Sequence, residues 1–206
     1  MPETIKKQVP VLIEKYLRDL NEALATLPKL ETAKVIEEII DAYRREKQIF
    51  ILGNGGSASA ASHFACDLGK GTLKRVYDEK EKRFRVASLT DNVALISALA
   101  NDLSYDDIFV QQLRNHVQRE DLVIAISGSG NSPNVIKAIE YAKRCGAKTI
   151  GFLGFGTGGE LAKIVDDAII IQSSNYGPIE DLHLVLSHLI TFCIAELKDD
   201  FDNRNP

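Results

Sequence analysis

The feature that most limits the fold is a series of five short apolar runs, most of them closed by glycine or serine and followed by helical periodicity. Runs this uniformly apolar suit strands that are buried on both faces, as in a parallel sheet covered by helices. Strand and helix alternate from residue 48 onward, which predicts right-handed crossovers and helices on both sides of the sheet. The five runs are 50–53, 84–88, 122–127, 149–154 and 168–172.

The predicted fold is α/β, a three-layer α/β/α sandwich with a five-stranded parallel sheet of the flavodoxin-like or Rossmann-like kind. Apolar residues recur at helical spacing over residues 5–45, with a break near Pro28, and therefore predict two helices before the first strand. A chain of 206 residues is near the size of one large α/β domain, so we expect 1–206 to form a single domain. Its expected parts are a helical arm (1–46) that favours assembly into oligomers, an α/β core (47–198) and a frayed polar tail (199–206).

The charge balance gives no general attraction for polyanions. The net charge is −4, so we expect no nucleic-acid partner and no membrane partner. A small anionic ligand would need a local anion-binding feature of the fold. No apolar run approaches the roughly 20 residues that span a bilayer. The three cysteines are far apart and set in apolar surroundings, which favours a reducing compartment, and the expected location is the cytoplasm.

Two turns after strands are candidate phosphate sites. The first predicted strand ends in Gly53-Asn54-Gly55-Gly56-Ser57, and a helix is expected to begin at Ser57. Such a turn directs backbone N–H groups and the positive end of the helix dipole toward one point, which suits an anion. The third strand runs into Ser127, Ser129 and Ser132, where hydroxyls can add hydrogen bonds and Ser132 is a natural N-cap before Pro133.

Either turn alone could be an ordinary strand-to-helix connection. Together they flank the point in an open α/β sheet where ligands bind, which favours a phosphate site. Neither the lysine of a nucleotide-binding loop nor the G-x-G-x-x-G spacing of a dinucleotide fold is present, so a nucleotide enzyme is not expected.

Histidines and carboxylates gather on two predicted helices. His63 and Asp67 are spaced i and i+4, on one face of a helix, and the last helix carries Glu180, His183 and His188. A surface hydrogen-bonded pair and a buried core histidine at His188 are the plain alternatives. The set His63, Asp67, Glu180 and His188 would suit zinc or another borderline divalent ion if the two helices meet.

Four blocks in order resemble the sedoheptulose 7-phosphate isomerase subfamily of the sugar isomerase (SIS) domain family. They are GNGGSASAASHFACDL, SLTDNVALISALAND, ISGSGNSPNVIKAIEYAK and IEDLHLVLSHLI, and with the N-terminal helices the resemblance covers nearly the whole chain. It implies an SIS domain that isomerises an aldose and a ketose phosphate, assembles as a homotetramer and binds one Zn²⁺ per subunit.

The resemblance also implies roles for individual residues. Asp67 and His188 match the acid/base pair that moves a proton between C1 and C2 through a cis-enediol. The implied zinc ligands are His63, Asp67, Glu180 and His188. The implied substrate-binding residues are Asn54, Gly55, Gly56, Ser57, Asp91, Asn92, Ser127, Ser129, Ser132 and Glu180, with Asn101 and Asp102 as further candidates.

This chain departs from the family pattern at two of these positions and in one turn. Asp67 replaces the usual glutamate, Glu180 replaces the usual glutamine, and YGPIED occupies the turn before the last helix, where a threonine- and arginine-bearing turn is common. A carboxylate that retreats by about 1 Å can change reaction geometry. Two alternatives therefore stay open: an isomerase for another phosphosugar, and a non-catalytic SIS-type module that acts through protein partners.

Overall fold

The sheet has five parallel strands, in a computed structural model that describes residues 3–202. The strands are β1 (Gln48–Gly53), β2 (Arg85–Ser88), β3 (Leu122–Ser127), β4 (Lys148–Leu153) and β5 (Asp167–Ile170). Their order is β2-β1-β3-β4-β5. The chain adds β2 on one side of β1, then crosses to the other side and adds β3, β4 and β5 in turn. The predicted doubly wound sheet is confirmed, with all five strands in the expected places.

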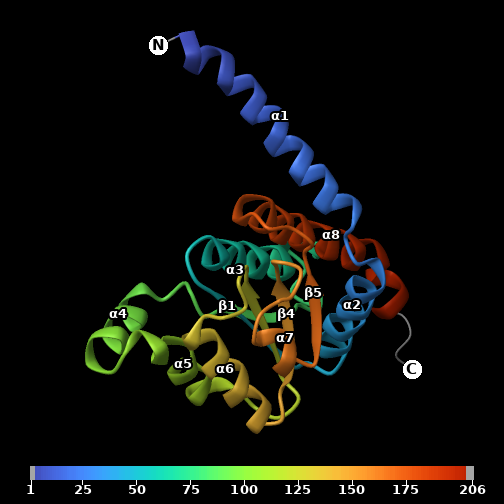
Figure 1. Ribbon diagram of the computed structural model, residues 1–206. Helices are drawn as coiled ribbons and strands as arrows, with labels where there is room; N and C mark the ends of the chain where they lie inside the picture. Colours follow the sequence, from blue (N-terminus) through green and yellow to red (C-terminus); the bar gives the residue numbers. More distant parts are fainter. Residues whose placement is uncertain (1–2, 203–206) are drawn as a thin grey trace.

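Helices cover both faces of this sheet (Figure 1). The helices on one face are α2 (Lys29–Arg44), α3 (Gly56–Cys66) and α8 (Tyr176–Asp202), and those on the other are α5 (Ile108–His116), α6 (Pro133–Arg144) and α7 (Leu161–Ile164). Alternate residues of β1 enter opposite cores: Ile49 packs with the first group and Phe50 with the second. This two-sided burial explains why the strand runs are apolar throughout.

The N-terminal arm is shorter than predicted. Of the two N-terminal helices, α1 (Glu3–Ala25) is the one that extends away from the sandwich (Figure 1). The second helix, α2, buries Val35 and Ile39 completely in the core, because its apolar face packs against β5 and α8. The expected 1–46 arm therefore ends with α1.

The C-terminal helix is longer than predicted. α8 continues to Asp202, and Phe201 is buried with its ring centroid 5.5 Å from that of Tyr43, so residues 199–202 are not frayed. The remainder of the expected tail, 203–206, lies outside the described residues. By length and composition alone α8 could cross a membrane, but half of its most apolar window is buried inside the domain, as in a core helix.

Candidate active site

The two glycine- and serine-rich turns lie next to each other at the carboxyl ends of their strands. β1 and β3 are neighbours, and Gly53 is paired with Ile126 in the ladder. We name Gly53–Ser57 the first turn and Ser127–Ser132 the second turn. Gly55 has φ 56°, a conformation that favours glycine, and it lets the chain turn directly into α3. The N-terminus of α3 therefore opens beside the second turn, as the phosphate-site prediction requires.

The serines of the second turn differ in their surroundings. Ser127 is buried and its Oγ accepts a hydrogen bond from the Gly130 N–H at 3.1 Å, and Ser129 Oγ accepts from the Asn131 N–H at 3.3 Å. Ser132 is the N-cap residue of α6, with Pro133 following, but within residues 3–202 its side chain makes no capping hydrogen bond. The predicted N-cap position of Ser132 is confirmed.

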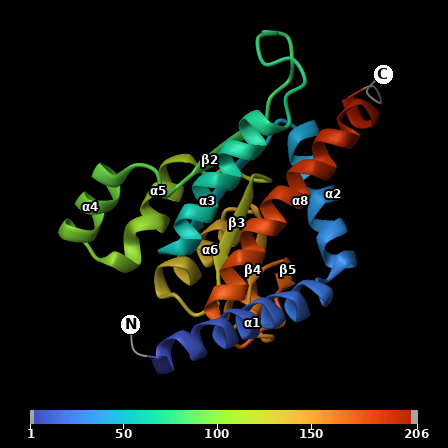
Figure 2. The ribbon, with the colours of Figure 1, turned by 90° about the horizontal axis from the view of Figure 1, so that it is seen from above.

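Helices α3 and α8 run side by side on one face of the sheet (Figure 2), and they bring three predicted site residues together. His63 Nε2 lies 2.8 Å from His188 Nε2 and 3.1 Å from Asp67 Oδ2. His188 Nε2 lies 3.8 Å from the same carboxylate oxygen. The sequence could not show that these helices meet, and the structure shows that they do.

This cluster of His63, Asp67 and His188 has the donors of a metal site. One nitrogen or oxygen atom from each side chain lies within 4.8 Å of the others. In a tetrahedral zinc site, ligand atoms about 2.0–2.1 Å from the ion are about 3.3 Å from one another, and the three distances here span that value. Two imidazoles and one carboxylate therefore fit zinc in both chemistry and spacing.

Asp67 stands at a change of helical geometry. α3 ends at Cys66, and the chain continues without a break as a π-helical segment, η1 (Asp67–Gly71). The wider π turn begins at the residue whose carboxylate faces the two histidines, and such turns are frequent at functional sites.

Glu180 is not part of the cluster. Its carboxylate lies against the first turn, where a β-carbon at Gly56 would come within 2.7 Å of Glu180 Oε2. Glu180 precedes His188 by about two helical turns, so its side chain faces the start of α3 while His188 faces the end. The predicted four-residue set therefore consists of three converging residues and one carboxylate that lies apart from them, beside the first turn.

His188 was expected to be buried, and this expectation is wrong. Its side chain is 58% exposed, because it faces the open edge of α3, whereas His183 occupies the apolar face of α8 and is completely buried. His183 Nε2 lies 3.3 Å from the carbonyl oxygen of Leu153 and so must carry the proton, and among the described residues Nδ1 has no hydrogen-bond partner. Burial lowers the pKa of His183 from 6.5 to about 4.

His183 makes the stability of the domain sensitive to mild acid. Between pH 6.5 and about 4 the unfolded chain binds a proton at His183 that the folded chain excludes. The stabilisation is complete above pH 6.5 and is lost as pH falls to about 4, by about 1.4 kcal/mol per pH unit and about 3 kcal/mol in total. Urea unfolding of wild type and His183→Gln at pH 7.5, 5.5 and 4.5 measures how the free energy of unfolding depends on pH. The variant should lose this slope, and His116→Gln, at an exposed histidine, should keep it; equal slopes in all three proteins would refute the assignment.

The residues after β2 divide between the cluster and a projecting helix. Asp91 Oδ1 accepts a hydrogen bond from Ser62, the residue before His63, so Asp91 lies beside α3. Asn92 instead caps α4 (Val93–Asp102), its Oδ1 accepting from the Leu95 N–H at 3.0 Å. Asn101 and Asp102 bond to each other at 2.9 Å at the far end of α4, which stands away from the sandwich (Figure 1). The structure brings Asp91 to the site and leaves the other three apart from it.

The side chain of Asn54 is hydrogen-bonded to another residue, Asn134, which the sequence analysis did not single out. Its side-chain amide exchanges two hydrogen bonds with that of Asn134, and Tyr105 donates to its Oδ1 at 3.1 Å. Tyr105 belongs to η2 (Tyr105–Asp107), a short 3-10 helix after α4. The sequence feature that could have indicated this contact is the position of Asn134, one residue after Pro133 at the start of α6.

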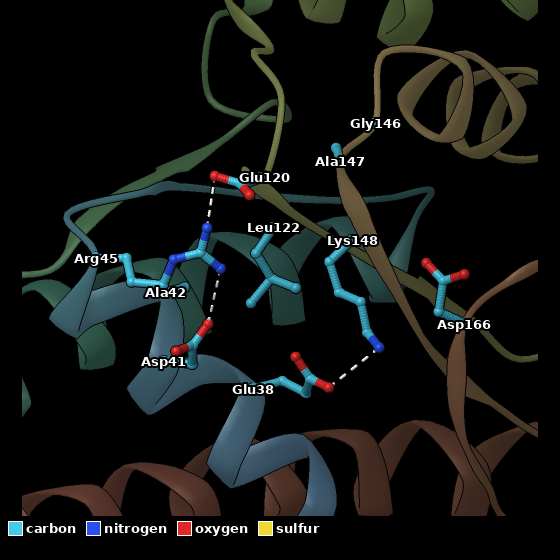
Figure 3. A pocket seen from close by; sticks show the side chains of 10 residues that line it. All are labelled: Glu38, Asp41, Ala42, Arg45, Glu120, Leu122, Gly146, Ala147, Lys148 and Asp166. Atoms are coloured by element: carbon cyan, nitrogen blue, oxygen red, sulfur yellow. Dashed lines mark hydrogen bonds and ion pairs between the residues drawn. The ribbon is translucent and has the colours of Figure 1, made fainter.

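A polar cavity of about 330 Å³ lies at the opposite end of the sheet, at the amino ends of β3 and β4 (Figure 3). Its charged groups already have partners in the protein: Arg45 pairs with Asp41 and Glu120, and Lys148 pairs with Glu38. Ligands of open α/β sheets bind at the carboxyl ends of strands, so the cluster and the two turns are the better candidate site.

Comparison with known proteins gives a consistent result. The SIS domain family model matches residues 14–154. A phosphoheptose isomerase from Helicobacter pylori (strain P12) is 35% identical over 183 residues, covering 88% of each chain. A probable phosphoheptose isomerase from Thermoplasma volcanium is 33% identical over 175 residues, covering 85% of this chain and 86% of the relative. The structure of phosphoheptose isomerase GmhA from Neisseria gonorrhoeae superposes with a TM-score of 0.81 at 27% identity, covering 93% of this chain and 99% of the other.

Proposed function

Because the chain belongs to the SIS domain family and, within it, to the phosphoheptose isomerases, we propose that it converts sedoheptulose 7-phosphate to D-glycero-D-manno-heptose 7-phosphate. Phosphosugar isomerisation, an aldose–ketose exchange, is the activity of this group. The observation that supports this enzyme most directly is the convergence of His63, Asp67 and His188 at the end of α3, the helix that begins at the first turn.

The proposed mechanism assigns the proton transfers to two side chains. Asp67 takes a proton from C1 of the ketose and returns it to C2, while His188 gives a proton to O2 as the cis-enediol forms and takes one from O1 as it collapses to the aldose. Asp67 Oδ2 and His188 Nε2 lie 3.8 Å apart, so both can reach adjacent atoms of one substrate. The N-terminus of α3 and the hydroxyls of Ser57, Ser127, Ser129 and Ser132 hold the phosphate at the other end of the sugar.

We further propose one Zn²⁺ per subunit. His63, Asp67 and His188 would hold it, and the bound ion would polarise the carbonyl and stabilise the enediolate. Glu180, expected from the sequence as a fourth ligand, lies against the first turn and is left out of this set. Two departures from the family pattern favour, as a second candidate, the same chemistry on another phosphosugar: Asp67 shortens the usual carboxylate, and Glu180 adds a negative charge beside the first turn.

Deuterium exchange tests the proposed reaction. The purified protein, with and without added zinc, would be incubated in D₂O with a panel of phosphosugars led by sedoheptulose 7-phosphate. NMR would follow deuterium entry at C1 and C2 and the appearance of aldose signals. Exchange with the heptulose supports the assignment, and exchange with another sugar alone keeps the mechanism and changes the substrate. A silent panel in the presence of zinc would contradict catalysis and favour the non-catalytic module.

We propose a cytoplasmic homotetramer in which the exposed apolar stripe of α1 is an assembly surface. Leu12 and Leu17 are 61% and 52% exposed in the single chain, and Ile13 and Tyr16 lie on the same side of the helix. We expect Leu12→Glu/Leu17→Glu to reduce the mass in solution, measured by light scattering after size exclusion. Arg18→Glu, on the opposite side of α1, is the matched control and should keep the wild-type mass; a full-sized double variant would exclude this stripe from the interface.

A further inference from the structure

The first turn and the helix that follows the second turn are joined by a pair of asparagine side chains, of which Asn134 is buried and Asn54 half-buried. Asn54 Nδ2 donates to Asn134 Oδ1 at 2.8 Å, and Asn134 Nδ2 donates to Asn54 Oδ1 at 2.9 Å. Asn54 is in the first turn, whereas Asn134 is in the first turn of α6, two residues beyond Ser132. The reciprocal pair therefore fixes the distance between the two segments that the proposed function assigns to phosphate.

Asn134 has no group left for a ligand. It is 1% exposed, and its Oδ1 also accepts the N–H of Val135 at 2.9 Å, so the amide contacts protein only. A buried amide that loses its partner keeps the full desolvation penalty, which makes the pair sensitive to change on either side. Any effect of Asn134 on binding must therefore pass through Asn54 and the turns.

The surrounding packing makes the alignment of the turns depend on this pair. Gly53 already lies against β3, since a β-carbon there would be 2.7 Å from the Ile126 carbonyl oxygen. That contact fixes the start of the first turn, and Asn54 is the next residue. The Asn54 Oδ1 that accepts from Asn134 also accepts a hydrogen bond from the Tyr105 hydroxyl, so the η2 segment is connected to the same amide.

We propose that Asn134 is a positioning residue for phosphate binding: through Asn54 it holds the backbone N–H groups of the first turn and the hydroxyls of the second at the separation that one phosphate needs. This inference rests on the proposed phosphosugar site and adds a residue that touches no substrate. A phosphate held from two separate segments is bound well only when both are aligned, because misplaced donors lose hydrogen-bond geometry.

The test is a double-variant cycle read out by phosphate binding. Inorganic phosphate would be titrated into wild type, Asn54→Ala, Asn134→Ala and the double variant, with backbone amide shifts or heat as the signal. We expect each single variant to weaken binding by about tenfold or more, and the double variant to be no weaker than the worse single one, because both changes break one connection. In the isomerase assay KM should rise in the same proportion while kcat stays within about twofold.

Gln112→Leu separates positioning from general stability. Gln112 is another buried amide, which donates to the carbonyls of Leu89 and Ile108 away from the turns. It should lower the melting temperature as the asparagine variants do and leave phosphate affinity unchanged. Wild-type affinity in Asn134→Ala, or equal weakening in Gln112→Leu, overturns the inference while the proposed function stands. Absence of phosphate binding to the wild type overturns both.

Discussion

Asp67→Asn is expected to reduce isomerase turnover by about 10²- to 10⁴-fold, the usual contribution of a positioned general base. The substitution keeps the size of the side chain and removes its ability to accept a proton from carbon. Asp67 is 23% exposed beside two exposed histidines, so the change should leave the folded structure intact. Deuterium entry at C1 of the recovered ketose measures the proton transfer itself, because it does not depend on release of the aldose product.

Two further variants assign the loss to Asp67. Asp67→Glu restores the length common in the family and should retain activity, whereas Asp199→Asn, at an exposed carboxylate near the end of α8, should match wild type. Zinc content measured on the same samples distinguishes a role as general base from a role as zinc ligand. Loss of exchange with zinc retained supports a base, and loss of both supports a ligand role. Wild-type exchange in Asp67→Asn would remove this residue from the mechanism.

Much of the fold could be predicted from sequence because its signals are local. Each strand is an apolar run whose alternate residues enter the two cores, as Ile49 and Phe50 do, and parallel pairing follows from the helices between the runs. The limits of the arm and the tail could not be predicted in the same way. α2 and residues 199–202 join the core through tertiary contacts, such as Phe201 with Tyr43, that no local pattern reveals.

The candidate site shows the same division. The i, i+4 spacing of His63 and Asp67 gave a 3.1 Å contact, since helical geometry alone fixes it. The relative burial of His183 and His188 was misjudged, because both lie in an apolar stretch of α8 and only the direction of the helix against the sheet separates them. The Asn54–Asn134 pair spans 80 positions and depends on the adjacency of β1 and β3, which sequence spacing cannot measure.

The charged loop between η1 and β2 also makes a buried contact that its composition does not reveal. The segment from 76 to 84 has the composition of a solvated loop, yet Glu81 is bound inside the structure. Its carboxylate accepts hydrogen bonds from the N–H groups of Lys74 and Arg75 and from Lys198 Nζ at 2.8 Å. The side chains of Glu81 and Lys198 are 6% and 2% exposed. These bonds, led by that from Lys198, lower the pKa of Glu81 to about 2.

Lys198→Met is expected to reduce the free energy of unfolding by about 3–5 kcal/mol, because it leaves the Glu81 carboxylate buried without its cation. Lys198 Nζ also donates to the carbonyl oxygens of Thr72 and Lys82, so the loop loses two bonds to α8 and Thr72, which precedes the loop, loses a third. The difference from wild type should be full above pH 4.5, the ordinary pKa of Glu81, and shrink as pH falls toward 2.

Denaturant unfolding at pH 7, with Lys74→Met as the matched control, measures this effect. Lys74 pairs with Asp199 on the same helix, but both side chains are open to water, at 42% and 69% exposed, so its loss should change stability by less than about 1 kcal/mol. Lys198→Met/Glu81→Leu should recover part of the lost stability, because no unpaired charge then remains buried. Equal effects of the two lysine variants would mean that water reaches Glu81 and that the loop is not held to α8 by this pair.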